Sequence, residues 1–185
     1  FPTKALAEDQ LHEFQGAVEA LGTEDGNNGE SSEIRAFTYD GDTPQDARKA
    51  IRQRANVVLT NPDMLHSGIL PHHTRWARYF ENLRYIVIDE LHYYRGVYGS
   101  HLANLLRRLK RICEFYNAKP QFICCSATIA NPRELAEALT GEPFELVERN
   151  GAPRGEKFFI FYNPPVVNRQ LGIRRSYIAE TRRMA

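Results

Sequence analysis

Apolar residues recur along the chain at two different spacings, and each spacing predicts one kind of element. From Leu6 to Leu21 and from Leu102 to Tyr116 they recur at helical spacing, which is typical of two amphipathic helices. Short, mostly apolar stretches predict strands at 36–39, 57–59, 85–88, 121–125 and 158–162. The run 85–88 is apolar at every position, which is typical of a strand buried on both faces.

Two dipeptides that combine a capping residue with a proline predict where further helices begin. In Thr43-Pro44 the threonine is expected to act as the N-cap, with the proline at the first helical position. Asn61-Pro62 predicts a short helix by the same device. Gly22 is expected to end the first helix of the chain.

A later helix has signals at both of its ends. Asn131 and Pro132, followed by Glu134, predict a capping-box start, and Gly141 predicts the end. Short apolar strands therefore alternate with amphipathic helices along the chain. This alternation predicts an α/β fold with a mainly parallel sheet flanked by helices.

Sites in parallel sheets lie just past the carboxyl ends of the strands, so the polar residues that follow each predicted strand matter most. These residues are Thr60, Asn61, Asp89, Glu90, Ser126 and Thr128. We therefore expect the functional groups of the domain to gather at this edge of the sheet.

Asp89 and Glu90 directly follow the most apolar strand. One carboxylate in that place can hold a magnesium ion through water, while the next orients or deprotonates an attacking water. An acidic strand end that caps a neighbouring helix is the alternative interpretation. Ser126 and Thr128 end the next strand, and their hydroxyls are expected to hydrogen-bond the cluster of Asp89 and His92.

The net charge of +1 gives no support for a nucleic-acid partner, but the charge is unevenly distributed. Arginine and lysine cluster at 48–54, 107–111 and 169–183. Such clusters can neutralise phosphates, or they can be solvated helix faces.

The three cysteines, Cys113, Cys124 and Cys125, do not form a disulfide framework. Cys124 and Cys125 are adjacent on one predicted strand and point to opposite faces, so they cannot share a metal ion in the usual spacing. No stretch is long and apolar enough to span a bilayer, and no signal peptide opens the sequence. These features predict an intracellular protein, in the cytoplasm and nucleoid or in a nucleus, that has no membrane partner.

Several segments, in order, resemble the motifs of superfamily 2 helicases of the DEAD/DEAH-box (DExH) type. Residues 88–92, Ile-Asp-Glu-Leu-His, resemble motif II (Walker B), and 126–128, Ser-Ala-Thr, resemble motif III. Residues 1–7, Phe-Pro-Thr-Lys-Ala-Leu-Ala, are similar to motif Ia. Residues 39–42 lie where the family has motif Ib, and 60–63 where it has motif Ic.

The resemblance covers nearly all of the chain to about Glu148, and its wording is most similar to the YprA/MrfA-like DNA-repair helicases, which are related to fungal RecQ4-like enzymes. It implies a partial first RecA-like domain of the P-loop NTPase type over 1–155. Residues 156–185 would be a linker and the first elements of a second RecA-like domain. Because the Gly-Lys-Ser/Thr loop that cradles a triphosphate is missing from the sequence, we expect a domain truncated at its N-terminal side. The isolated chain is then expected to be inactive as an ATPase.

The same resemblance implies a role for each site residue. Asp89 would hold Mg²⁺ through water and Glu90 would activate the hydrolytic water. His92, with Ser126 and Thr128, would couple the ATP site to the second domain.

A second group of residues would contact the sugar–phosphate backbone of one nucleic-acid strand: Thr3, Lys4, Gly41, Thr60 and Asn61. Helix N-termini close to these positions favour phosphate, and such contacts position a strand without reading its sequence. Simple helix capping by Thr60 and Asn61 is the alternative.

The function implied is that of an ATP-dependent DNA helicase and translocase with ATP and Mg²⁺ as cofactors. It would move 3′ to 5′ on single-stranded or partly duplex DNA, in DNA repair. An RNA helicase and a non-catalytic α/β nucleic-acid-binding module remain alternatives. A metal-dependent hydrolase built on Asp89, Glu90 and His92 would need further ligands for which the sequence offers no convincing set.

Overall fold

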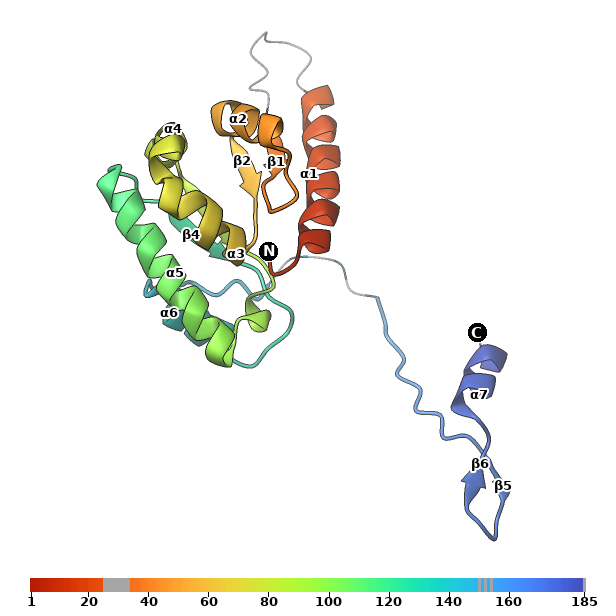
Figure 1. Cartoon of the computed structure of the whole chain (residues 1–185). Helices are drawn as coiled ribbons and strands as arrows, with labels where there is room; N and C mark the ends of the chain where they lie inside the picture. Colours follow the sequence, from red (N-terminus) through yellow and green to blue (C-terminus); the bar gives the residue numbers. More distant parts are fainter. Residues whose placement is uncertain (25–33, 150, 152, 154, 185) are drawn as a thin grey trace. The chain divides into compact units, whose positions relative to one another are not determined.

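The computed structural model describes residues 1–184 except 25–33, 150, 152 and 154. The chain divides into two compact units, Phe1–Leu146 and Val147–Ala185. Figure 1 shows the elements of both units, which are described separately below.

The first unit alternates strands with helices, as the sequence predicts. Its strands are β1 (Ala36–Thr38), β2 (Val57–Leu59), β3 (Tyr85–Ile88) and β4 (Gln121–Cys124). Its α-helices are α1 (Lys4–Glu24), α2 (Gln45–Arg54), α3 (Pro62–Met64), α4 (Ala77–Glu81), α5 (Gly96–Phe115) and α6 (Pro132–Thr140). A π-helical turn at Leu65–Ile69 and 3₁₀ segments at Leu70–Trp76 and Leu91–Tyr93 complete the unit.

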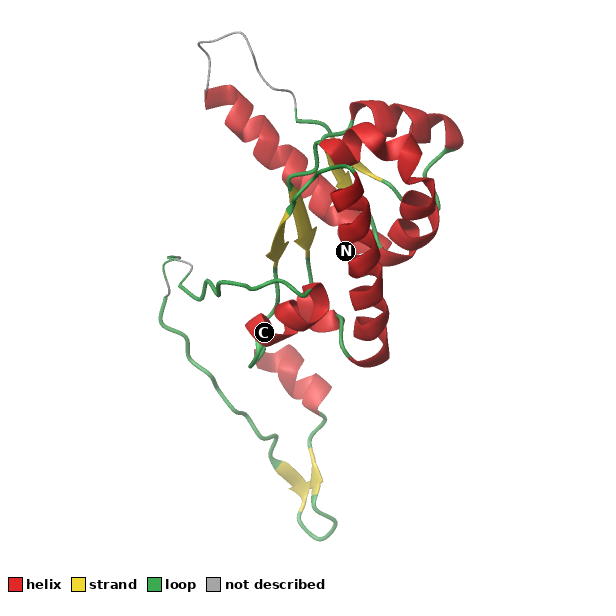
Figure 2. Ribbon diagram, turned by 90° about the vertical axis from the view of Figure 1, so that its left-hand side faces the viewer, coloured by secondary structure: helices red, strands yellow, loops and turns green. Residues whose placement is uncertain are grey.

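The strands of this unit pair in parallel, which confirms the α/β class. β1 pairs with β2, with Ala36 opposite Val57, and β3 pairs with β4, with Ile88 opposite Cys124. In the described chain the two pairs form separate two-stranded sheets, visible as separate pairs of arrows in Figure 2. Residues of β2 and β3 line one apolar groove of about 1240 Å³ that lies between these pairs.

The hydrophobic core lies against the long helix α5. Its inward face carries Leu102, Leu105, Leu106 and Leu109, all of them buried. Trp76 is 2% exposed and meets the ring of Tyr39 edge-on, with 4.9 Å between ring centroids. The helical spacing of leucines in the sequence therefore identified the buried face correctly.

The expectation that β3 is buried on both faces is wrong for this structure. Ile88 is 7% exposed, whereas Tyr85 and Val87 are 60% and 55% exposed. The core packs against Ile86 and Ile88, and nothing in the described chain covers the opposite face. An apolar run indicates which side chains would gain from burial, but it does not supply the element that buries them.

Two predicted helix ends also differ from the structure. Helix α1 continues through Gly22 to Glu24, because a glycine inside a helix costs only about 1 kcal/mol and does not force an end. Thr43 is not an N-cap: α2 has Pro44 in that place and no side-chain cap. The hydroxyl of Thr43 instead accepts a hydrogen bond from the backbone N–H of Asp40 (2.9 Å).

The other two helix starts lie where the sequence predicts them. Asn61 caps α3, since its Oδ1 accepts from the N–H of Met64 at 2.8 Å. Helix α6 begins after Asn131 and ends at Gly141, which has a positive φ of 70°. The capping box itself is not formed, because the side chain of Asn131 donates to the Glu134 carboxylate (3.3 Å).

The second unit contains a short antiparallel pair, β5 (Val166–Asn168) with β6 (Ile173–Arg174), and helix α7 (Tyr177–Met184). The strand predicted at 158–162 is not formed. Its side chains are exposed, and the described residues offer it no partner strand with which to pair. The unit is instead held together by Glu180, whose carboxylate accepts hydrogen bonds from Tyr162 (2.8 Å) and Arg175 (3.2 Å).

Candidate functional site

The ends of β3 and β4 are joined by backbone hydrogen bonds that continue past both strands. The N–H of Cys125 donates to the carbonyl of Ile88, and the N–H of Leu91 donates to the carbonyl of Cys125, each at 2.9 Å. Asp89 and Glu90 therefore lie directly beside the segment that begins at Ser126. This is the neighbourhood that the sequence predicts from the carboxyl ends of parallel strands.

Glu90 lies at a sharp turn between β3 and the 3₁₀ segment Leu91–Tyr93. Its backbone is left-handed, with φ 52° and ψ 43°, which costs a residue other than glycine roughly 1–2 kcal/mol. This turn brings its carboxylate Oε2 within 3.1 Å of Nε2 of His92. Strain of this kind is found where a structure must hold a side chain in one place.

His92 links the end of β3 to the segment that follows β4. The backbone N–H of Ala127 donates to Nδ1 of His92 at 3.2 Å. Because that nitrogen accepts, the ring proton of a neutral His92 belongs on Nε2, the nitrogen that faces the Glu90 carboxylate. The imidazole thus connects the Glu90 carboxylate to the backbone of the 126–128 segment.

The contact between residues 88–92 and residues 126–128 was predicted, but the atoms that make it were not. Ser126 and Thr128 are exposed, and within the described chain their hydroxyls make no hydrogen bond to Asp89 or His92. The expected hydroxyl contacts are therefore wrong for this structure. The backbone N–H of Ala127 makes the contact instead, because the chain turns its amide toward the imidazole.

Asp89 is half-buried at the same strand end and offers hard carboxylate oxygens, which suit Mg²⁺. No group of three or more His, Cys, Asp and Glu side chains that could hold a metal ion occurs among the described residues. The donor set fits an ion that takes one protein carboxylate and draws its remaining ligands from water and phosphate. It does not fit a metal site built from protein side chains alone.

The residues predicted to contact nucleic acid come from segments far apart in the sequence and lie near one another. The backbone nitrogen of Phe1 donates to the carbonyl of Thr60 (3.1 Å), which ties the start of α1 to the end of β2. The hydroxyl of Thr60 donates to the carbonyl of Tyr39 (2.7 Å). Lys4 forms an ion pair with Asp42, beside Gly41.

Thr3 and Asn61 also have local roles at helix starts. The N–H of Leu6 donates to the Thr3 hydroxyl (3.4 Å), and the Oδ1 of Asn61 accepts from Met64. The capping alternative is therefore realised for Asn61. Its side-chain NH₂ group has no protein acceptor in the described chain, so capping and phosphate contact are compatible.

Arg48 belongs to the first basic cluster, but it contacts the loop 40–43 instead of facing solvent alone. Its Nε donates to the carbonyl of Thr43 (2.9 Å), and its Nη2 donates to the carbonyls of Asp40 (3.0 Å) and Gly41 (3.3 Å). The guanidinium also lies 5.3 Å from the ring centroid of Tyr39. Sequence reasoning missed this clamp, because a cluster of charges does not reveal which member turns back onto the backbone.

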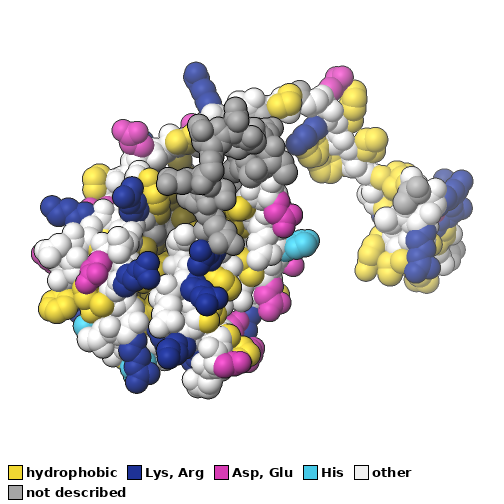
Figure 3. All heavy atoms as spheres, turned by 90° about the horizontal axis from the view of Figure 1, so that it is seen from above, with side chains coloured by type: hydrophobic (Ala, Val, Ile, Leu, Met, Phe, Trp, Pro, Cys, Tyr) yellow, Lys and Arg dark blue, Asp and Glu magenta, His cyan; other side chains and the backbone are white. Residues whose placement is uncertain are grey.

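Basic side chains do not merge into one uniform patch on the face seen in Figure 3, where they are interspersed with acidic ones. This agrees with the small net charge of the chain. On this face, contacts to a phosphate backbone would therefore be made by individual residues and not by a broad positive surface.

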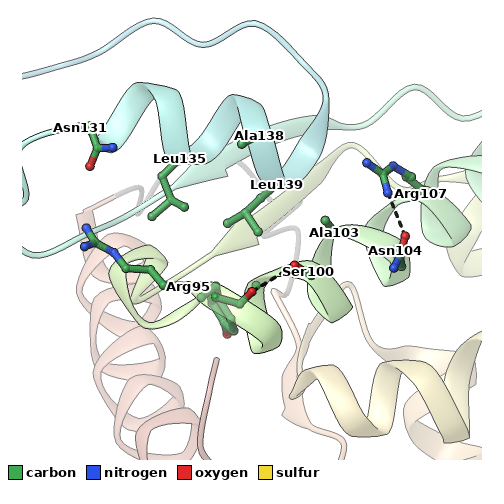
Figure 4. Close-up of a pocket in the computed structure, with 12 residues that line it drawn as sticks. Arg95, Ser100, Ala103, Asn104, Arg107, Asn131, Leu135, Ala138 and Leu139 are labelled. Carbon is green, nitrogen blue, oxygen red and sulfur yellow. Dashed lines mark hydrogen bonds between the residues drawn. The ribbon is translucent and has the colours of Figure 1, made fainter.

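A separate hollow of about 490 Å³ lies between α5 and α6. Leu135 and Leu139 of α6 point toward α5, and Arg95 and Arg107 lie toward opposite ends of the hollow (Figure 4). Arg107 donates to the side chain of Asn104 (2.8 Å). Packing between the helices that follow the two motif segments is thus incomplete.

Fold and site together define an α/β domain that carries its polar groups at the carboxyl edge of parallel strands. Comparison with known proteins gives the family: the chain belongs to the DEAD/DEAH box helicase family, which matches residues 1–136. This confirms the resemblance drawn from the motifs. Within the described residues, no helix has the length and apolar character needed to cross a membrane.

Individual relatives share much of this sequence. The chain is 59% identical over 185 residues to the "Uncharacterized ATP-dependent helicase YprA" of Bacillus subtilis, covering 100% of the chain and 24% of that protein. It is 41% identical over 170 residues to the ATP-dependent helicase hrq1 of Schizosaccharomyces pombe, covering 91% of the chain and 15% of that protein. The chain thus spans a quarter or less of the length of these relatives.

Solved structures agree in fold. A crystal structure of the DUF1998 helicase MrfA bound to DNA matches the whole chain with a TM-score of 0.89 and 58% identity, over 23% of its own length. A second structure, of MrfA bound to DNA and AMPPNP, matches with a TM-score of 0.87 at the same identity and covers 24% of that protein.

Proposed function

We propose that the protein is an ATP-driven helicase that translocates on single-stranded DNA, and that this chain supplies the hydrolytic carboxylates and part of the strand-binding surface. One observation carries the proposal: His92 joins Glu90 to the segment after β4 through Ala127. Membership of the helicase family and the DNA- and AMPPNP-bound structures of MrfA support it.

Glu90 is the group proposed to accept the proton of the attacking water. The imidazole of His92, whose Nε2 lies 3.1 Å from Oε2 of Glu90, holds the carboxylate in place, and a carboxylate is the form that can accept a proton. Asp89 is the carboxylate that would hold Mg²⁺, which neutralises charge on the transferred phosphoryl group when it is bound. In this proposal His92 positions Glu90, Glu90 accepts the proton and Asp89 holds the ion.

The link through Ala127 is proposed to carry the coupling. A shift of the Ser126–Thr128 segment moves the N–H that holds His92, and His92 in turn holds Glu90. A second RecA-like domain of the full-length protein, whose first elements we place at 156–185, is the proposed source of that shift. The first domain would then extend over 1–155 and be of the RecA-like type.

Strand binding is assigned to Thr3, Lys4, Gly41, Thr60 and Asn61. These residues present an ammonium group, hydroxyls, an amide and a loop backbone, which suit phosphate and sugar, and contacts of that kind position a strand without reading its sequence. We propose movement 3′ to 5′ and a role in DNA repair inside the cell. RNA would be bound by the same kind of contacts and is the alternative substrate.

The experiment is ATP hydrolysis by the full-length protein, measured alone, with single-stranded DNA and with single-stranded RNA of the same sequence. The proposal predicts turnover that requires Mg²⁺ and rises most with DNA. Stronger stimulation by RNA would assign an RNA helicase instead. Strand binding without any hydrolysis would contradict the proposal and favour a non-catalytic binding module.

A further inference from the structure

Lys4, which the proposed function assigns to the phosphate backbone, already has an anionic partner. Its Nζ makes a charged hydrogen bond to Oδ2 of Asp42, at the tip of the loop between β1 and α2. The two side chains are 45% and 82% exposed, so the pair lies in solvent where a strand could reach it. Hydrogen bonding to Asp42 is the main reason that the pKa of Lys4 lies above its ordinary value.

The position of Asp42 is set by the loop that carries it. Its backbone N–H donates to Oδ1 of Asp40 (2.8 Å), which closes a tight turn. Arg48 fixes the same turn by donating to the carbonyls of Asp40 and Gly41. The carboxylate of Asp42 is therefore presented to Lys4 by a preformed loop.

Glu8 provides a natural comparison within the same unit. It lies one helical turn after Lys4 on α1, it is exposed, and its charge also acts on Lys4. No hydrogen bond joins Glu8 to Lys4 in the described structure, whereas one joins Asp42 to Lys4. Among the described residues, Asp42 is thus the one that bonds Lys4 where a phosphate oxygen would bind.

We propose that Asp42 is a resident counter-ion of Lys4 that a phosphate must displace, and that it thereby limits the affinity of the protein for a nucleic-acid strand. The inference rests on the proposed function, since it takes Lys4 as a phosphate contact. Binding then exchanges one exposed ion pair for another, and such pairs differ little in energy. Release of the strand is assisted in the same way, because Lys4 forms its ion pair with Asp42 again when the phosphate leaves.

The exchange has a measurable signature in salt dependence. The counter-ions that binding releases are cations condensed on the strand. A lysine whose charge is balanced by a carboxylate neutralises less phosphate charge and so releases fewer of them. Asp42→Asn should therefore tighten binding about two- to fivefold at low salt. It should also steepen the slope of log affinity against log salt by up to about 0.7 for a single strand.

The test is equilibrium binding of a fluorescein-labelled single-stranded oligodeoxynucleotide to the full-length protein over a series of salt concentrations. The variants are Asp42→Asn, Lys4→Met and the double variant, with Glu8→Gln as the matched charge control and thermal melting as a check on folding. We expect Asp42→Asn to tighten binding, Glu8→Gln to change it much less, and Asp42→Asn to have no effect in the Lys4→Met background.

Two results would overturn the inference while leaving the proposed function intact: unchanged binding by Asp42→Asn, or equal tightening with and without Lys4. Equal tightening would mean that Asp42 acts only through general electrostatics. A wild-type protein that binds no strand at any salt would instead refute the proposed function, and the inference with it.

Discussion

Nε2 of His92 lies 3.1 Å from Oε2 of Glu90, and the same imidazole accepts a hydrogen bond from Ala127 through Nδ1. A neutral imidazole satisfies both contacts at once only in the tautomer that carries its proton on Nε2. Glu90 has a strained, left-handed backbone, and its carboxylate is contacted by His92. His92 is in turn hydrogen-bonded to the segment that follows β4.

Replacement of His92 should uncouple hydrolysis from strand binding. His92→Ala removes the hydrogen bond from Ala127 and the ion-pair contact with Glu90, and it is expected to lower DNA-stimulated turnover by about tenfold or more, the equivalent of one charged hydrogen bond. His92→Gln can still donate to Glu90 and should retain more activity. The measurement is steady-state ATP hydrolysis by the full-length protein, and His101→Ala, an exposed position on α5, is the control. Equal turnover in His92→Ala and wild type would contradict the link.

Arg48 should matter for strand binding through the loop and not through its charge. Arg48→Met removes the donors to the carbonyls of Asp40, Gly41 and Thr43, and should weaken DNA binding about tenfold while leaving DNA-independent hydrolysis unchanged. Its neighbour Lys49 is exposed and makes no contact with this loop in the described structure. If Lys49→Met weakened binding as much as Arg48→Met, the basic cluster would act as a phosphate-neutralising patch after all.

Two glycines give opposite predictions for stability. A Cβ at Gly99 would lie 2.6 Å from the backbone oxygen of Tyr94, so Gly99→Ala should destabilise the protein by about 1–3 kcal/mol. Gly16 lies inside α1 with nothing within 4 Å of the added atom, and Gly16→Ala should stabilise by up to about 1 kcal/mol. Urea unfolding followed by circular dichroism measures both. A neutral Gly99→Ala would show that the start of α5 can move away from Tyr94.

Buried thiol and phenol groups predict loss of stability at alkaline pH. Burial raises the pKa of Cys113 from 9.0 to about 11 and that of Tyr79 from 10.0 to about 12. The folded state thus holds these protons more tightly than the unfolded state. The resulting stabilisation is complete below about pH 9 and is lost as the pH rises toward 11 and 12. Unfolding free energies at pH 8, 9, 10 and 11 should fall across this range, and less steeply in Cys113→Ala. An identical slope of unfolding free energy against pH in that variant would show that Cys113 does not contribute to the loss of stability.

Local patterns in the sequence were sufficient for the positions of strands β1 to β4, the apolar face of α5 and the cap at Asn61, because each is marked by residues close together in the sequence. They failed at Tyr85, Val87 and the segment 158–162, where burial depends on another element that the apolar run itself does not specify. An apolar run shows that a segment is suited to burial, but it does not show which element buries it.

The sequence predicted which segments form the candidate site, but not which atoms make the contacts between them. Motif order brought Glu90, His92 and the Ser126–Thr128 segment together, and the structure agrees. Which group of that segment faces His92 depends on backbone direction, which residue types do not reveal, so the N–H of Ala127 was overlooked. The contacts of Arg48 and Asp42 were not predicted for a related reason. A cluster of charged residues in the sequence does not show which group each side chain contacts.

Glu90 is the proposed proton acceptor for hydrolysis, and Glu90→Gln in the full-length protein tests this role most directly. The amide keeps the size of the side chain but cannot take a proton. Its exposed counterpart Glu114→Gln on α5 is the control. We predict that Glu90→Gln binds ATP about as tightly as wild type and hydrolyses it slower by roughly two orders of magnitude or more, with single-stranded DNA present. Hydrolysis at the wild-type rate by this variant would contradict the assignment of the site.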